Sequence, residues 1–218
     1  MTKKHTIYWS IVGLCTLAFA LLTWQVLQGH TNAIDKEILV ALESIRTPGL
    51  NTLMETLTYF GSWEAIVIIC LLYIAYDRGD FTGSAIVIVT AITTTLFRTA
   101  VKALMARPRP FVLWDNFHSV IKETGYSYPS GHSIASMSIY LVILLLLLKK
   151  MDKGNKRTAL VVGFGFFAVF VGLTRLYLGV HYPSDVLAGW LSGIAWALTV
   201  FALVEIIRDK IESANRKA

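Results

Sequence analysis

An arginine, a histidine and an aspartate lie close together near the end of the chain, beside long apolar runs. They are Arg175, His181 and Asp185. Ionisable groups at the edge of membrane-depth segments are costly to place, so they commonly mark a working site. Gly179 is expected to end one helix and Pro183 to begin the next. This turn would bring His181 and Asp185 within contact.

The chemistry that suits such a pair is nucleophilic attack on phosphorus. A carboxylate on one ring nitrogen fixes the histidine tautomer and leaves the other nitrogen free to attack. Arg175 would hold the phosphoryl oxygens as negative charge develops. The competing interpretation is a His–Asp helix cap with an arginine that faces lipid headgroups.

A second polar group is Pro129-Ser130-Gly131-His132, directly before an apolar run. Ser130 is a typical N-cap, and the free N–H groups of a helix start bind anions. Gly131 allows a phosphate to approach the backbone closely. His132 would then protonate the leaving oxygen. The alternative is an ordinary capped helix with an interfacial histidine.

The third group runs from Lys102 to Pro110. Prolines 108 and 110 disfavour helix at the residues before them, so the third apolar helix should end here. Lys102 would lie in its last turns, and Arg109 would follow in an extended segment. An ammonium and a guanidinium can then grip one phosphate, although interfacial cations that reach headgroups would look similar.

Other polar residues are less informative. Arg98 lies one turn before Lys102, where it either pairs with an acid such as Glu64 or extends the cationic pocket. Three residues of the loop before Tyr128 are expected to be solvated, although a lid or headgroup contact is also open: Asp115, His118 and Glu123.

The elements that must position these groups are membrane-spanning helices. Of the residues, 55% are hydrophobic and 16% charged, whereas soluble domains carry about a quarter charged residues. A span takes about 20 residues, and backbone in lipid must be helical. Six spans are predicted: Ile7–Leu27, Thr58–Tyr76, Ser84–Ala106, Ser133–Leu148 (starting nearer Gly131), Ala159–Leu178 and Val186–Ile207.

The fold class is therefore all-α, a polytopic bundle of six transmembrane helices forming one domain over residues 1–218. Twelve Lys and Arg residues fall on one side of the predicted spans and five on the other. The positive-inside rule then predicts that both termini are cytoplasmic and that the polar groups face outward. The net charge of +6 is explained by topology and anionic headgroups rather than nucleic acid. The first outer loop, with weak helical periodicity over 34–45, is expected to lie along the membrane surface.

A metal is not expected. His132, His181 and Asp185 form a two-His-one-carboxylate set in principle. However, Lys102, Arg109 and Arg175 would crowd cations around a cation, and they neutralise phosphate as metals do elsewhere. No cofactor is predicted.

Taken in order, the three groups resemble the signature of the type 2 phosphatidic acid phosphatase superfamily, Lys-x6-Arg-Pro, Pro-Ser-Gly-His and Ser-Arg-x5-His-x3-Asp. The departure is Thr174 where the family usually has serine, which keeps the hydroxyl. The resemblance implies a nucleophile, an orienting carboxylate and an acid, here His181, Asp185 and His132. It implies phosphate binding by a further set: Lys102, Arg109, Ser130, Gly131 and Arg175.

The expected function is metal-independent hydrolysis of a membrane lipid phosphate at the outer face. The small size resembles bacterial members of the family, which act on phosphatidylglycerol phosphate, phosphatidic acid and undecaprenyl diphosphate. The partners are thus a lipid substrate and the bilayer, with no nucleic acid, and oligomeric state is left open. The alternatives are a lipid phosphotransferase with the same site and a non-catalytic lipid-binding or transport protein.

Overall fold

The computed structural model describes residues 3–79 and 81–215. Helices and their connections make up this part of the chain, which contains no strand. The long helices are α1 (Lys3–Leu27), α5 (Phe81–Met105), α7 (Gly131–Lys149), α8 (Asn155–Tyr177) and α9 (Pro183–Asn215). Shorter elements are α2 (Asn32–Ser44), α3 (Pro48–Thr58), a 3-10 turn (Tyr59–Gly61), α4 (Trp63–Tyr76) and α6 (Pro110–Leu113).

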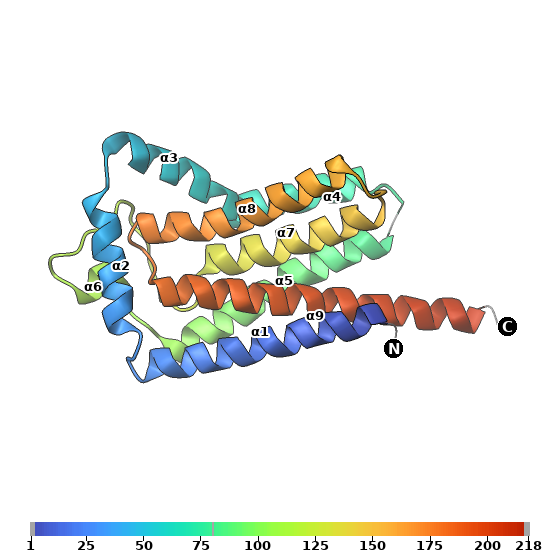
Figure 1. Ribbon diagram of the computed structural model, residues 1–218, viewed down its shortest axis with the longest axis horizontal. Coiled ribbons are helices and arrows are strands. Elements are labelled where there is room, and N and C mark those ends of the chain that lie inside the picture. The colour runs from blue at the N-terminus through green and yellow to red at the C-terminus, as the bar shows by residue number, and fades with distance from the viewer. Residues whose placement is uncertain (1–2, 80, 216–218) are drawn as a thin grey trace.

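The long helices run side by side, and α7 lies among α4, α5, α8 and α9 (Figure 1). Each of the five is long and apolar enough to cross a bilayer. Helix α1 packs on α9 and leaves much of its apolar surface outward, as lipid-facing helices do. Five of the six predicted spans are thus confirmed as helices suitable for crossing, and this is a multi-pass membrane protein.

The second predicted span, Thr58–Tyr76, is not one continuous helix. Helix α4 starts at Trp63 because Ser62 is extended and its side chain accepts a hydrogen bond from the Ala65 amide. Its 14 residues rise only about 21 Å, short of a bilayer core of about 30 Å. The segments 48–61 and 63–76 meet at a 52° bend, and a sixth crossing exists only if this bent pair is counted as one span.

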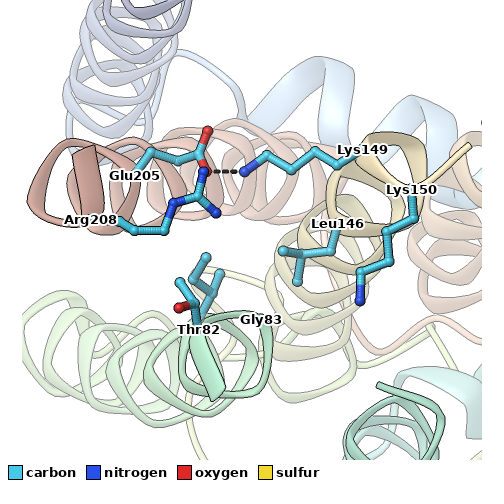
Figure 2. A pocket seen from close by; sticks show the side chains of 8 residues that line it. Thr82, Gly83, Leu146, Lys149, Lys150, Glu205 and Arg208 are labelled. Atoms are coloured by element: carbon cyan, nitrogen blue, oxygen red, sulfur yellow. Dashed lines mark hydrogen bonds and ion pairs between the residues drawn. The ribbon is translucent and has the colours of Figure 1, made fainter. Parts of the chain in front are cut away.

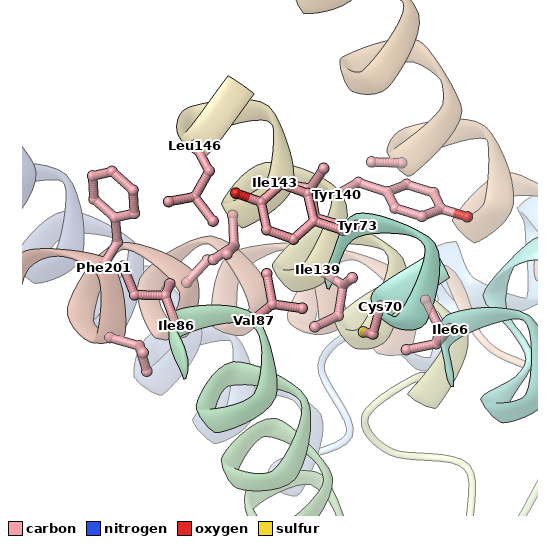
Figure 3. Close-up of a cluster of buried hydrophobic side chains, with 14 residues drawn as sticks. Ile66, Cys70, Tyr73, Ile86, Val87, Ile139, Tyr140, Ile143, Leu146 and Phe201 are labelled. Carbon is pink, nitrogen blue, oxygen red and sulfur yellow. The ribbon is translucent and has the colours of Figure 1, made fainter. Parts of the chain in front are cut away.

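The main apolar core joins α4, α5, α7 and α9, with side chains from each converging in Figure 3. Ile86 and Val87 of α5 and Phe201 of α9 are almost completely buried there. This core fixes the helices relative to one another. The polar residues at the helix ends are therefore carried on a rigid frame.

One end of the bundle is covered by α2, α3 and α6, which lie beside the last turns of α8 and the first turns of α9 (Figure 1). The helical periodicity predicted for the first outer loop is confirmed by α2. Helix α1 begins and α9 ends toward the opposite end of the bundle. That the termini face the cytoplasm stays a prediction.

Candidate active site

Backbone hydrogen bonds join the three predicted polar groups into one site at the α2–α6 end of the bundle. The Ser127 amide donates to the Arg107 carbonyl at 2.8 Å. The Ser130 amide donates to the Asp185 carbonyl at 3.0 Å. Val120, in the loop between α6 and α7, donates to Leu178 at 2.9 Å. Backbone hydrogen bonds thus hold segments that are far apart in sequence next to one another.

The turn between α8 and α9 has the form predicted from Gly179 and Pro183. Gly179 has φ +75°, a left-handed conformation that favours glycine. Its amide bonds to the Leu176 carbonyl, and the Val180 amide bonds to the Arg175 carbonyl, which is a Schellman motif. Pro183 then opens α9. The turn therefore brings Arg175, in the last turn of α8, close to His181, and Asp185 follows in the first turn of α9.

His181 and Asp185 are in contact, as expected. The Nδ1 atom of His181 lies 3.3 Å from Oδ2 of Asp185, and both residues are buried. The same carboxylate oxygen accepts hydrogen bonds from the Tyr182 amide at 3.0 Å and from Ser127 Oγ. These donors fix the carboxylate, so it can orient the imidazole.

The other ring nitrogen of His181 lies 3.3 Å from Nη1 of Arg109. A guanidinium only donates, so Nε2 is an acceptor and the ring proton resides on Nδ1, toward Asp185. Burial, followed by the charges of Arg109, Lys102 and Arg175, lowers the pKa of His181 well below its usual value. The imidazole is therefore neutral at neutral pH, with a lone pair on Nε2.

The predicted phosphate-binding cations lie near the His181 ring, close enough for their charges to act on it. Arg109 is extended, as predicted, and donates to the Val180 carbonyl at 2.8 Å. Lys102 reaches the carbonyls of Tyr126 and Ser127, next to His181. Arg175 is buried at the last turn of α8 and donates to Thr58 Oγ1 at 3.0 Å. Three positive charges thus converge from three segments.

The helix start before His132 also has the predicted form. Ser130 is extended and its side chain accepts from the Ser133 amide, so α7 begins at Gly131. A Cβ built on Gly131 would lie 2.7 Å from Arg98 Nη1, so Arg98 points toward this helix start. Of the two interpretations left open for Arg98, the structure favours an extended cationic pocket. The ring of His132 packs against Gly61.

One loop residue does not behave as predicted. Glu123 was expected to be solvated with Asp115 and His118, which are exposed. Instead it forms an ion pair with Arg175 and another with Arg109 at 3.4 Å. The solvated interpretation is wrong for Glu123, because the loop folds back over the predicted phosphate-binding arginines.

Sequence reasoning also missed three polar residues around Asp185: Asp35, Arg107 and Ser127. From the sequence, Arg107 is only one of the cations on the outer side of the predicted spans, and Asp35 belongs to the first outer loop without a motif. In the structure Asp35 is on α2. The Arg-Pro-Arg-Pro repeat was the available signal for Arg107. No signal pointed to Asp35.

A separate cavity of 440 Å³ lies at the opposite end of the bundle, between α5, α7 and α9 (Figure 2). Lys149 and Glu205 form an ion pair across it, and Arg208 lies 3.7 Å from the same glutamate. It contains none of the predicted site residues. Among residues 3–79 and 81–215, no three His, Cys, Asp or Glu side chains gather as metal ligands do.

Comparison with known proteins places these observations in a family. A model of the PAP2 superfamily matches residues 83–209. Phosphatidylglycerophosphatase B of Bacillus subtilis is 32% identical over 195 residues, covering 86% of this chain and 91% of the relative. An undecaprenyl-diphosphatase of Sulfolobus acidocaldarius is 34% identical over 145 residues, 66% of each chain.

The fold has solved counterparts. A crystal structure of a transmembrane PAP2 type phosphatidylglycerolphosphate phosphatase from Bacillus subtilis superimposes with a TM-score of 0.82 at 28% identity. It covers 90% of this chain and 96% of that one. LpxE of Aquifex aeolicus shares the fold with a TM-score of 0.63 at 22% identity, over 76% and 93% of the two chains.

Proposed function

This protein belongs to the PAP2 superfamily and is a membrane phosphoric ester hydrolase, and we propose that it dephosphorylates a lipid through a phosphohistidine on His181. The observation that carries the proposal is the state of that imidazole. Its Nδ1 faces the Asp185 carboxylate, and its Nε2 faces the guanidinium of Arg109. An oriented neutral imidazole among cations is suited to attack an anionic phosphoryl group.

In the first step Nε2 of His181 bonds to phosphorus, and the bond from phosphorus to the leaving oxygen breaks. His132 gives its proton to that oxygen. The phosphorylated imidazole keeps the Nδ1 proton and carries a positive charge, which Asp185 stabilises. Water then attacks phosphorus, His132 takes the water proton, the P–N bond breaks, and phosphate is released.

Five residues are proposed to hold the phosphoryl oxygens: Lys102, Arg109, Ser130, Gly131 and Arg175. The cations neutralise charge that increases in the transition state, and the N-terminal amides of α7 add donors. Such a donor set does for phosphate what metal ions do in other phosphatases. We therefore propose that the reaction needs no metal ion.

The substrate is proposed to be a lipid phosphate monoester or diphosphate. The candidates are phosphatidylglycerol phosphate and undecaprenyl diphosphate, in keeping with the names of two relatives. Phosphatidic acid is a third candidate, from the resemblance of the three motifs to the family signature. An apolar groove of 360 Å³ between α4 and α5 has Arg98 and Gly61 among its lining residues, so a lipid tail in it would reach the site. We propose that this end of the bundle is on the outer face, because the Lys and Arg residues concentrate on the other side of the predicted spans.

The test is phosphate release by purified protein in detergent, with the three lipids compared. His181→Ala should lose turnover and still bind lipid. His118→Ala removes an exposed histidine of the same side of the molecule and should leave turnover unchanged. Near-normal turnover in His181→Ala would reject the nucleophile, and phosphate transfer to an added lipid acceptor without release would indicate a phosphotransferase.

A further inference from the structure

A buried arginine lies between two buried carboxylates behind the proposed nucleophile. Arg107 Nη1 lies 2.7 Å from Oδ1 of Asp185, and Nη2 lies 2.8 Å from Oδ2 of Asp35. The side chains are 10%, 0% and 1% exposed, in the order Arg107, Asp185 and Asp35. Charges this deeply buried require partners, so the three form one unit.

The three residues come from separate elements. Asp35 is on α2, Arg107 is in the connection from α5 to α6, and Asp185 is in the first turn of α9. Ser184 adds a second link, since its amide donates to Asp35 Oδ1 at 2.9 Å and its hydroxyl to Oδ2 at 2.6 Å. The ring of Tyr182 covers the Arg107 guanidinium, 3.8 Å from its centroid.

We infer that Arg107 and Asp35 are positioning residues for His181, acting through Asp185. Arg107 holds Oδ1 of Asp185, which leaves Oδ2 for the His181 ring. Neither residue contacts the predicted phosphate-binding side of the imidazole. The inference rests on the proposed function, because it concerns the same nucleophile.

The sum of charges explains why two residues are needed. Asp185 and Arg107 alone would be neutral, and they would give little support to the positive charge of the phosphorylated ring. Asp35 restores a net charge of −1 behind Nδ1. The chain of alternating charges therefore fixes the carboxylate and still stabilises the intermediate.

Several other charged groups act on His181 and must stay constant in a test. They come from α5, the α5–α6 connection, the loop before α7, α7, α8 and α9: Lys102, Arg109, Glu123, His132, Arg175 and Asp185. Substitution of Arg107 or Asp35 leaves all of them in place. A shift in the acid limb of the pH profile then reports the charge behind Nδ1.

The two single substitutions should shift this limb in opposite directions. Arg107→Gln makes the charge behind Nδ1 more negative, so His181 protonates more readily and the acid limb of kcat/KM moves up by about one pH unit. Asp35→Asn makes it neutral, and the limb moves down. In both, kcat should fall by about 10- to 100-fold, the size found when residues that orient a metal-binding histidine are removed. KM should change little.

The double variant Arg107→Gln with Asp35→Asn restores a net charge of −1 and should return the limb toward its original position. Arg107→Lys keeps the positive charge but cannot contact both carboxylates as the guanidinium does. It should therefore lower kcat without moving the acid limb. Both variants avoid leaving two unpaired buried carboxylates, which guards against misfolding. Arg46→Gln is the matched control, because Arg46 pairs with Glu43 and binds carbonyls on the same side of the molecule.

The measurement is phosphate release across pH with thermal unfolding of each variant in detergent. Opposite shifts in the single variants and their cancellation in the double variant would establish the inference. The inference would be overturned if the acid limb of kcat/KM did not shift in the single variants, and if each loss of kcat only matched the loss of folded protein, as expected for Arg46→Gln. An inactive wild type or an active His181→Ala would instead overturn the proposed function and this inference with it.

Discussion

Asp185→Asn is a sharp perturbation of the site, because it changes charge with almost no change in volume. In the structure, Oδ2 of Asp185 faces the Tyr182 amide, Ser127 Oγ and His181 Nδ1, and Oδ1 faces Arg107. An asparagine has one acceptor oxygen. If this oxygen takes the place of Oδ2, the amide N–H groups point at the Arg107 guanidinium, donor against donor.

Two magnitudes follow from this geometry. Removing one partner of a buried ion pair costs about 3–5 kcal/mol of stability. The effect on turnover should resemble that in serine proteases, where the equivalent carboxylate-to-amide change costs about 10⁴-fold. At about 1.36 kcal/mol for each factor of ten, this is about 5.5 kcal/mol of transition-state stabilisation.

The assay is kcat for phosphate release at saturating lipid, with the folded fraction measured by thermal unfolding in the same detergent. Asp115→Asn is the control, since Asp115 is an exposed loop aspartate. A folded Asp185→Asn protein within about tenfold of wild type would refute the claim that this carboxylate orients the nucleophile.

Further predictions concern packing, pH and metal. Gly189→Ala places a Cβ 2.6 Å from Ser133 Cβ and 3.0 Å from the Ser130 carbonyl, so thermal unfolding should show a loss of about 1–3 kcal/mol, with a raised KM. Gly165→Ala in α8 has open space around the new Cβ, so it should leave stability unchanged or raise it by up to about 1 kcal/mol. Because the pKa of His181 is lowered, kcat/KM should begin to fall only when the pH drops below about 6.5. A decline of kcat/KM that begins above that pH would contradict this prediction. His181 binds a proton more readily in the unfolded chain than in the folded protein. The free energy of unfolding should therefore be highest above pH about 6.5 and decrease as the pH falls below it, which thermal unfolding at several pH values would detect. Activity should persist in excess EDTA, and a loss that Mg²⁺ reverses would show that the protein cations are insufficient.

Features fixed by local chemistry were predictable from the sequence. The break after α8, the cap at Ser130 and the extended Arg109 each depend on a residue and its immediate neighbours. Glycine, serine and proline have strong local preferences, so the turns around the site could be placed. The contact of His181 with Asp185 followed from these turns.

Features fixed by tertiary packing were not predictable in the same way. Asp35 has no local motif, and its role depends on α2 lying across the start of α9. The sequence around Glu123 does not distinguish it from other loop acids, because its ion pair with Arg175 forms only through the tertiary fold of the loop. The interrupted second span depends on Ser62 and Gly61, where close packing of Gly61 against Val171 and His132 leaves no room for a side chain.

Rapid-quench labelling is the most direct test for a covalent phosphohistidine at His181. Lipid substrate with a radiolabelled phosphoryl group is mixed with excess protein, quenched in alkali and digested for mass spectrometry. A phosphohistidine intermediate should give an acid-labile, alkali-stable label on the peptide containing His181, and His181→Ala should carry no such label. A label on another residue, or no label and inversion of configuration at a chiral phosphorus, would contradict it.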